Sequence, residues 1–492
     1  MSKPTICLIT PPSPFLLDER VFMHIGILKV ASALEQEGYP IDFLDLAGIS
    51  NYLEVVSSYC KDNPTTIFGI TATTPQIPYA VKVKDEIKGI VKDSKIILGG
   101  THVSLMHSAY KAETKKGVPS RATEDIGKLC DNFDTLVAGD GELAMLKALE
   151  MSHGIVDADD RKSELFLSNE QFSTSPLPAR HLVDIDTYNY SIGGENAISV
   201  IAQLGCPFKC TFCGGRNSPF LRNIRTRDTS SVIDELEYLH VTYGFKGFMF
   251  YDDELNVNKQ WEELLQGIIA LQDKYGAKFM LRGFVKAEIF TEKQAELMYK
   301  AGFRWLLTGF ESGDERILKN IEKIAKVKDN TRCIEIAKKY GLKVKALMSI
   351  GHAGESKETI SNTKNWLLEV KPDDFDCSII TTYPGSPYFD DAVEGTDGVY
   401  TYTQPRTGDK LYQKPLNYMK DADYYKGDPD GGYSAYVWTD FLTSDDLVIE
   451  RDNLEREVRE ILKIPFNQTS STTKFEHSMG QGIPDSILRK SK

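Results

Sequence analysis

The chain alternates short apolar runs with amphipathic segments in two separate series, and this alternation limits its fold more than any other feature. In residues 1–150, five strands are expected, with helical periodicity between most pairs, for instance over Phe22–Glu37 and Tyr79–Val91. The strands are expected at Thr5–Thr10, Ile41–Leu46, Thr66–Thr71, Lys95–Gly99 and Thr135–Ala138. This alternation predicts a doubly wound parallel sheet covered by helices, as in Rossmann-like domains.

The second alternating series occupies residues 196–388. Its strands are expected at Ala197–Gln203, Gly247–Tyr251, Lys278–Arg282, Trp305–Gly309, Lys343–Ile350 and Phe375–Thr381. Helices are expected between them, such as Ser231–Tyr243, Glu292–Ala301, Thr331–Tyr340 and Lys357–Val370. Six strand–helix units predict an open partial (β/α)6 barrel, in which the chemistry lies at the carboxyl ends of the strands.

The remaining segments are expected to connect and cover these two α/β domains. Residues 151–195 show little periodicity and contain a Ser- and Pro-rich stretch at 173–180, which is typical of an interdomain linker. Residues 389–465 are rich in Gly, Asp and Tyr before a helix near Ser444–Leu462, and are expected to form a lid and substrate region or a third small domain. Residues 466–492 are expected to form a flexible tail.

Cys206, Cys210 and Cys213 lie on a loop after the first strand of the second series. Thiolates at this spacing suit three corners of a four-iron cluster, which leaves one iron open to a small molecule. A structural zinc site normally takes four protein ligands in paired sets, and no second Cys or His pair follows at short range. A disulfide framework fits less well, because eight cysteines in 492 residues are sparse.

With Phe212 before the last cysteine, the motif Cys-x3-Cys-x2-Cys resembles that of the radical S-adenosylmethionine (SAM) enzymes. The resemblance implies a [4Fe–4S] cluster whose open iron is chelated by SAM, and a 5'-deoxyadenosyl radical that abstracts hydrogen from unactivated carbon. It also implies SAM contacts along the strand ends of the barrel. The residues that match the family's SAM site are Phe212, Asp252, Arg282, Glu311, Ser312 and Gly351.

Some of these motifs also have structural alternatives. Asp253 and Glu254, which follow Asp252, equally suit the N-cap and first turn of a helix. The segment after Gly351 is similar to the family's Gly-x-Pro-Gly-Glu but has Ala353 where proline is commoner. The Pro-Gly-Ser-Pro sequence at 384–387 resembles the Pro-Gly-Thr-Pro turn of one subclass, and its main expected role is a tight turn.

Small polar residues and glycines mark the expected strand ends of the first series, where a doubly wound sheet binds its ligands. The ordered motifs Gly-Gly-x-His and Gly-x-Gly-Glu resemble the cobalamin-binding domain of one radical SAM subclass. The residues expected to contact cobalamin are Thr10, Pro11, Thr73, Gly99, Gly100, His102, Gly139, Gly141 and Glu142. No Asp-x-His-x-x-Gly is present, so cobalamin is expected to bind without a histidine in place of its lower base. His102 is expected on a loop, either at the corrin edge or as an ordinary hydrogen-bonded histidine.

The cofactors implied by the resemblance favour C-methylation of an unactivated carbon. One alternative keeps both cofactors but closes a ring or oxidises the substrate, as the related anaerobic porphyrin-ester cyclase does. A second is a methylthiotransferase, for which Cys7, Cys60 and Cys130 are candidate ligands of a second cluster. A third is a non-catalytic iron–sulfur or cobalamin sensor. The expected partners are a small-molecule or peptide substrate and an electron donor such as flavodoxin or ferredoxin.

Charge and hydropathy argue against a broad nucleic-acid surface, though not against a local basic patch, and against a membrane-spanning segment. The formal net charge of −13 argues against a broad nucleic-acid surface, because phosphate binding relies on clustered Lys and Arg. No apolar run approaches the roughly 20 residues needed to cross a bilayer. The N-terminal sequence leads directly into a strand-like run without a targeting pattern, so a cytoplasmic location is expected.

Overall fold

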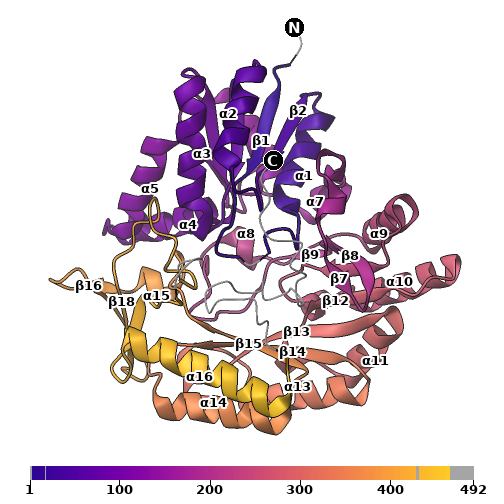
Figure 1. Ribbon diagram of the computed structural model, residues 1–492, viewed down its shortest axis with the longest axis vertical. Helices are drawn as coiled ribbons and strands as arrows, with labels where there is room; N and C mark the ends of the chain where they lie inside the picture. Colours follow the sequence, from indigo (N-terminus) through magenta and orange to yellow (C-terminus); the bar gives the residue numbers. More distant parts are fainter. Residues whose placement is uncertain (1–2, 17, 428–431, 466–492) are drawn as a thin grey trace.

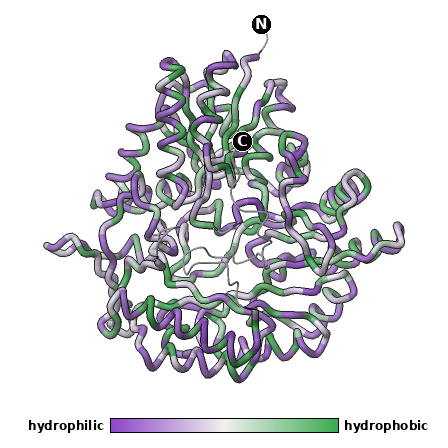
Figure 2. The backbone as a smooth tube through the Cα atoms, in the orientation of Figure 1, coloured by the Kyte–Doolittle hydropathy of each residue, from purple (hydrophilic) through white to green (hydrophobic). Residues whose placement is uncertain are grey.

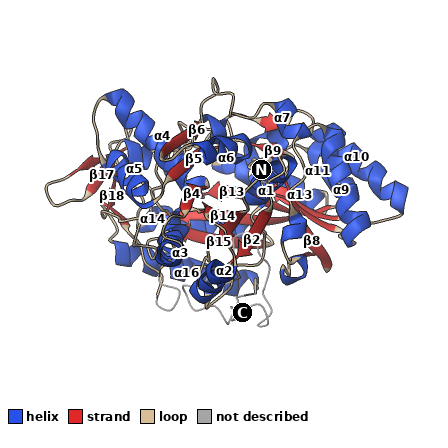
Figure 3. Cartoon of the chain, turned by 90° about the horizontal axis from the view of Figure 1, so that it is seen from above, coloured by secondary structure: helices blue, strands red, loops and turns tan. Residues whose placement is uncertain are grey.

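Figure 1 shows the computed structural model of the chain, in which an N-terminal α/β domain in indigo and purple lies above a second α/β domain in pink and orange. The structure describes residues 3–16, 18–427 and 432–465. The predicted tail at 466–492 lies outside these residues. Seen from above, strands occupy the middle of the molecule and helices surround them (Figure 3). The predicted α/β class is therefore confirmed.

The N-terminal sheet has six parallel strands in the order β2-β1-β3-β4-β5-β6. The five predicted strands are present as β1 (Ile6–Thr10), β2 (Ile41–Asp45), β3 (Ile67–Thr71), β4 (Lys95–Gly99) and β5 (Thr135–Gly139). A sixth, β6 (Gly154–Ala158), lies in the segment for which the sequence predicts a linker. Among the described strands, β6 pairs only with β5 and therefore forms an edge, so it lacks the continuous apolar run of a central strand.

Helices cover both faces of this sheet. α1 (Ile25–Gln36) and α6 (Gly141–Glu150) pack on one face. The helices on the other face are α2 (Tyr52–Asp62), α3 (Ile77–Ile90), α4 (Thr101–Lys116) and α5 (Arg121–Asn132). The neighbouring strands β1 and β3 are thus followed by helices on opposite faces, which opens a crevice at their carboxyl ends.

The first helix begins later than its periodicity predicts. α1 begins at Ile25 rather than Phe22, and His24, at its N-cap, has a non-helical φ of −76° and ψ of 85°. Val21 packs in a cluster with Met249 and Leu307 of the second domain, and Met23 joins that domain's main core. Contacts between the domains therefore draw this apolar segment out of the helix.

Residues 151–195 wrap between the domains. Besides β6 they form α7 (Asn169–Thr174), two 3₁₀ turns (Arg180–Leu182 and Ile185–Thr187) and β7 (Ser191–Ile192). Arg180 is buried, with Nη1 2.7 Å from Oε1 of Glu235, and its Nη2 donates to the carbonyl of Ser199. Arg227 pairs with the same carboxylate. Burial alone would raise the pKa of Glu235, but the two guanidinium groups lower it below its ordinary value. This ion-pair cluster ties the connecting segment to the second domain.

The second sheet has seven strands in the order β15-β14-β13-β12-β11-β8-β7, of which only β7 is antiparallel to its neighbour. The six parallel strands are β8 (Glu195–Val200), β11 (Gly247–Phe250), β12 (Met280–Phe284), β13 (Phe303–Glu311), β14 (Lys343–Ile350) and β15 (Asp374–Ile379). They confirm the predicted partial barrel. A short ribbon of β9 (Gln203–Leu204) and β10 (Arg225–Thr226) flanks the cysteine loop.

Helices line the outside of the barrel sheet. They are α9 (Thr229–Tyr243), α10 (Trp261–Tyr275), α11 (Glu292–Ala301), α13 (Val327–Lys339) and α14 (Lys357–Val370). Two short helices, α8 (Pro219–Arg222) and α12 (Glu315–Asn320), lie beside the cysteine loop instead. Further 3₁₀ turns lie at Thr74–Gln76, Leu255–Val257 and Ala287–Ile289. Figure 2 shows hydrophobic segments concentrated in the strands and hydrophilic ones along the outermost helices, which places the core between sheet and helices.

The C-terminal region contacts both α/β domains. It contains α15 (Pro387–Asp390), an antiparallel sheet of β16 (Val393–Glu394), β17 (Tyr400–Thr403), β18 (Lys410–Gln413) and β19 (Val437–Thr439), and α16 (Ser444–Leu462). α16 packs beside α14 and β15 (Figure 1). Tyr418 and Tyr424 are buried in a core of the N-terminal domain. Among the described residues, no helix is both long and apolar enough to span a membrane.

Candidate functional site

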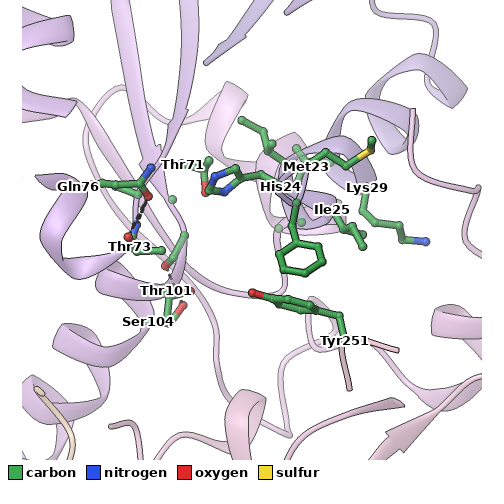
Figure 4. A pocket seen from close by; sticks show the side chains of 18 of the residues that line it. Met23, His24, Ile25, Lys29, Thr71, Thr73, Gln76, Thr101, Ser104 and Tyr251 are labelled. Atoms are coloured by element: carbon green, nitrogen blue, oxygen red, sulfur yellow. Dashed lines mark hydrogen bonds between the residues drawn. The ribbon is translucent and has the colours of Figure 1, made fainter. Parts of the chain in front are cut away.

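A cavity of about 740 Å³ lies between the carboxyl ends of the two parallel sheets. Gly99 and Gly139 line it from the ends of β4 and β5, whereas Ile201 and Tyr251 line it from the segments after β8 and β11. Figure 4 shows Tyr251 across the cavity from Thr101 and Ser104. Residues from both domains therefore face one cavity.

The N-terminal wall of the cavity contains most of the residues that the sequence assigns to cobalamin. Thr73, Gly99, Gly100, Gly139, Gly141 and Glu142 line it. Gly100 has a φ of +99°, and a Cβ there would lie 2.6 Å from the amide nitrogen of Ala72. Gly139 has a φ of +91°, and its Cβ would meet the backbone of Ala158. Only glycine fits these close backbone approaches.

Three of the residues assigned to cobalamin do not line the cavity: Thr10, Pro11 and His102. The expectation that His102 lies on a loop is wrong, because it belongs to the first turn of α4. Its ring centroid lies 5.3 Å from that of Tyr418, and burial lowers its pKa to about 3. His102 is thus a neutral histidine packed inside the N-terminal domain.

A deep apolar part of the cavity extends below α1 and α6. Leu8, Ile97, Val137 and Met145 line it. Gly69 of β3 keeps this slot open, because a Cβ there would lie 2.7 Å from Leu8 Cδ2 and 3.2 Å from Met145 Cε. The residues present fit a cofactor with an arm that enters the domain beside the sheet.

The three cysteines lie on a loop fixed by its own backbone. The amide of Cys206 donates to the carbonyl of Leu221, and that of Cys213 donates to the carbonyl of Cys210. Arg222 Nη2 lies 3.1 Å from the Sγ of Cys213. Within residues 3–16, 18–427 and 432–465, no three His, Cys, Asp or Glu side chains converge on a single-ion site. A cubane is larger than one ion, because each thiolate binds a different iron.

Cationic side chains surround the cysteine loop. Burial raises the pKa of Cys206 to about 12. Burial also raises the pKa of Cys210, although the charges of Lys323 and Lys286 oppose this rise. Burial would lower the pKa of Lys286, but Cys210 and Glu254 raise it above its ordinary value. Together with Arg222, these lysines fit an anionic group bound to the three sulfurs.

The acids after β11 hold the start of the cysteine loop. Oδ1 of the buried Asp252 accepts hydrogen bonds from the amides of Ala202 and Gln203, at 2.7 and 3.0 Å. Asp253 accepts one from the amide of Gly205. Neither Asp253 nor Glu254 caps a helix through its side chain: the N-cap of the following 3₁₀ turn is Glu254, without a cap hydrogen bond. Burial raises the pKa of Asp252 to about 7, and its Oδ2 has no hydrogen-bond partner among the described residues.

Glu311 stands at a strained position at the end of β13. Its φ is +67°, and the pairing of β13 with β14 shifts register between Gly309 and Glu311. Ser349 Oγ donates to Glu311 Oε2 at 2.8 Å and lies 2.8 Å from His352 Nε2. Lys323 Nζ is 3.7 Å from Glu311 Oε1. A non-glycine residue with this φ is uncommon, and such strain clusters at functional sites.

The other residues predicted for SAM have different surroundings. The ring of Phe212 lies 5.3 Å from that of His352, which joins the cysteine loop to the Glu311 network. Arg282 is buried, 3.4 Å from the hydroxyl of Tyr190 and over the ring of Trp305. Ser312 lies 3.1 Å from the Thr363 hydroxyl and accepts from the amide of Asp314. Gly351, with a φ of +87°, packs near residues of β15 and α16. The structure thus brings Phe212 and Glu311 into one network, but not Arg282 or Ser312.

Several cavity residues are absent from the sequence-based assignments. They are His24, Phe22, Tyr251, Tyr383 and Tyr425. The apolar pattern around His24 predicts a helix, which concealed its place on the β1–α1 connection. Tyr251 is the last residue of the predicted second barrel strand and directly follows β11 in the structure, so its place at a strand end was the available signal.

Two family models match consecutive parts of the chain. Residues 20–120 match the B12 binding domain, and residues 200–367 match the radical SAM superfamily. The chain is 26% identical over 407 residues to an uncharacterised methyltransferase of Pyrococcus horikoshii, covering 79% of this chain and 83% of that protein. It is also 26% identical over 399 residues to the anaerobic magnesium-protoporphyrin IX monomethyl ester cyclase of Cereibacter sphaeroides, covering 77% of this chain but only 61% of the cyclase.

A solved structure shows the same arrangement of domains. It is the radical SAM methyltransferase TsrM of Kitasatospora setae with cobalamin and a [4Fe–4S] cluster bound. Its TM-score is 0.65 at 15% identity, covering 98% of this chain and 94% of TsrM. The two matched domains imply a [4Fe–4S] cluster, SAM and cobalamin as cofactors. With a B12 binding domain followed by a radical SAM domain, the chain belongs to the cobalamin-dependent radical SAM family.

Proposed function

We propose that the protein is a cobalamin-dependent radical SAM methyltransferase that adds a methyl group to an unactivated carbon atom. The observation that carries this proposal is the cavity lined by both domains, with Gly214 beside Cys213 on one side and Gly99 and Gly139 on the other. When bound, the cluster and SAM supply hydrogen abstraction and cobalamin supplies methyl transfer. The protein's own task is to hold the substrate between these cofactors and to exclude water.

In this proposal Cys206, Cys210 and Cys213 hold the cluster. The charges of Lys286 and Lys323 oppose the rise that burial causes in the pKa of Cys210, and they offset the negative charge of the sulfurs. Arg222 contacts Cys213 directly. Hydrogen bonds to sulfur and nearby charge both tune the reduction potential of a cluster. Lys286, Lys323 and Arg222 would therefore favour the reduced, more negative state of a bound cluster.

We assign SAM binding to the strand ends next to the cysteine loop. Ser349 and Lys323 orient the carboxylate of Glu311, while Phe212 packs against His352. Oδ2 of Asp252, which has no hydrogen-bond partner in the part of the chain that the structure describes, provides a second acceptor on the same edge of the sheet. We assign cobalamin to the N-terminal wall, where Gly99, Gly100, Gly139 and Gly141 line the cavity at the ends of β4 and β5.

The substrate is proposed to be a small molecule with apolar or aromatic groups. Phe22, Tyr251, Tyr383 and Tyr425 line the cavity and offer flat apolar surface with hydroxyl tips. A cytoplasmic location and a flavodoxin- or ferredoxin-like electron donor remain part of the proposal.

Cyclisation or oxidation of a porphyrin-like substrate is the second candidate, because the chain resembles the magnesium-protoporphyrin ester cyclase over 399 residues. The methylthiotransferase alternative has less support. Cys7 and Cys60 are buried in a hydrophobic core, where burial raises the pKa of Cys60 to about 11, while Cys130 is exposed on α5. The burial of Cys7 and Cys60 favours structural roles for them.

The test is anaerobic reconstitution with iron, sulfide, cobalamin and SAM, followed by reduction and analysis of the nucleoside products. We expect about four irons per chain, bound cobalamin, and formation of 5'-deoxyadenosine and S-adenosylhomocysteine. About eight irons would support a second cluster. Substrate assays with methyl-labelled SAM separate the two candidates, since methylation adds a labelled carbon to the product and cyclisation does not.

A matched pair of variants tests the cluster ligands. Cys210→Ala is expected to abolish reductive cleavage of SAM, whereas Cys130→Ala, at an exposed cysteine of α5, is expected to retain it. Reductive cleavage by Cys210→Ala would contradict the proposal, as would a purified protein that binds neither cobalamin nor SAM.

A further inference from the structure

His24 lies at the carboxyl end of the N-terminal sheet, where the helices that follow β1 and β3 go to opposite faces. It ends the connection from β1 to α1, next to the crevice between β1 and β3, and it lines the cavity. Figure 4 shows its imidazole on the α1 side of the cavity, directed toward Thr71 at the end of β3. The ring therefore reaches the wall on which the cobalamin residues lie.

Within the described ranges, the side chain of His24 makes no hydrogen bond, ion pair or ring contact. Its backbone carbonyl accepts from the amide of Leu28. Other histidines with buried rings in this protein pack on aromatic rings, as His102 does on Tyr418 and His352 on Phe212. His24 thus presents ring nitrogens to the cavity.

The residues next to His24 in the chain offer its ring no polar partner. Its chain neighbours Met23 and Ile25 also line the cavity, and both are apolar. Burial lowers the pKa of His24, and the charge that opposes this is that of Asp45 at the end of β2, which is engaged by Arg20 and Tyr188. A neutral imidazole in apolar surroundings is a common ligand of transition-metal ions.

We propose that a ring nitrogen of His24 would hold bound cobalamin by ligating its cobalt. This inference rests on the proposed function, because it requires cobalamin in the N-terminal wall of the cavity. It revises the expectation of histidine-free binding, which follows from the missing Asp-x-His-x-x-Gly motif. That motif describes one short spacing, whereas the long β1–α1 connection brings a later histidine to the cavity.

The test is electron paramagnetic resonance of the full-length protein loaded with cobalamin and reduced to the cobalt(II) state. A nitrogen ligand splits each cobalt line, into a triplet for ¹⁴N and a doublet for ¹⁵N. We expect protein labelled with ¹⁵N-histidine to show doublets, since the cofactor's own base remains ¹⁴N. Persistent triplets, or lines without nitrogen splitting, would overturn the inference.

Two variants complete the test. His24→Ala is expected to bind cobalamin but lose the doublet, whereas His153→Ala, at a side chain with 75% exposure, is expected to keep it. The labelled wild-type spectrum decides the question even where His24→Ala fails to fold. Absence of bound cobalamin would overturn the proposed function together with this inference, whereas bound cobalamin without a doublet would overturn the inference alone.

Discussion

Replacing Gly100 by alanine is expected to destabilise the N-terminal domain by about 2–6 kcal/mol. The φ of +99° and ψ of −176° lie in a region that is essentially restricted to glycine and costs about 1–3 kcal/mol for other residues. The new Cβ would also lie 2.6 and 2.7 Å from the nitrogen and oxygen of Ala72. Relieving this overlap costs about 1–3 kcal/mol more. Ala72 cannot move freely, because its amide donates to Gly99 and its carbonyl accepts from His102.

Gly117→Ala is the matched control, because Gly117 ends the same helix, α4, that Gly100 begins. Its φ is +69°, and a Cβ there meets no atom within 4 Å. Only the backbone cost of about 1–2 kcal/mol remains. Thermal unfolding followed by circular dichroism measures the loss of stability in both variants. Each kcal/mol lowers the midpoint by about 2–4 °C for a domain of this size. We expect Gly100→Ala to lower the midpoint more than Gly117→Ala, and to weaken cobalamin binding as well. Equal midpoints for the two variants would refute the argument from close backbone approach.

Three further predictions concern buried charges and the SAM network. Glu235→Gln should destabilise the protein by about 3–5 kcal/mol at pH 7, because it leaves two buried guanidinium groups without their carboxylate. Since the folded-state pKa of Glu235 is lowered, the difference in stability between wild type and Glu235→Gln should shrink as the pH falls below about 4.5. A difference in thermal midpoint that stays constant with pH would contradict the lowered pKa. The folded-state pKa of Asp252 is raised from 3.8 to about 7, so its neutral form favours folding. This contribution to stability is lost as the pH rises from about 4 to about 7. Asp252→Asn should therefore flatten the plot of stability against pH over this range, measured without cofactors. Ser349→Ala removes the 2.8 Å hydrogen bond to Glu311, and a hydrogen bond to a charged group is worth about 1.5–3 kcal/mol. Calorimetry should therefore show SAM binding weakened tenfold or more. Unchanged affinity for SAM would exclude Glu311 from the site.

Local signals in the sequence account for much of the fold. The bounds of β4, α11, α14 and α16 agree with the predictions from periodicity and turn residues. The three helices each begin with a capping box in which a Ser or Thr side chain accepts from the amide three residues on. Such signals act within one helical turn, so they are readable without knowledge of the tertiary structure.

Edge elements and interdomain contacts were less predictable. β6 pairs along one edge and lies in a polar segment, so its pattern resembles a linker. Val21 and Met23 continue a helical pattern, yet they pack against the second domain and leave α1 to begin at Ile25. In both cases the deciding contacts come from residues far away in the sequence.

By itself the sequence determined the order of the domains, the three cysteines and the glycines at the strand ends, because these features follow from spacing and local conformation. Only the tertiary structure decided which side chains share the cavity. It placed His24 and Tyr251 there, and it buried His102 in α4 against Tyr418. The physical reason is that a side chain's surroundings depend on how two sheets and a C-terminal region pack together, and no short stretch of sequence encodes that packing.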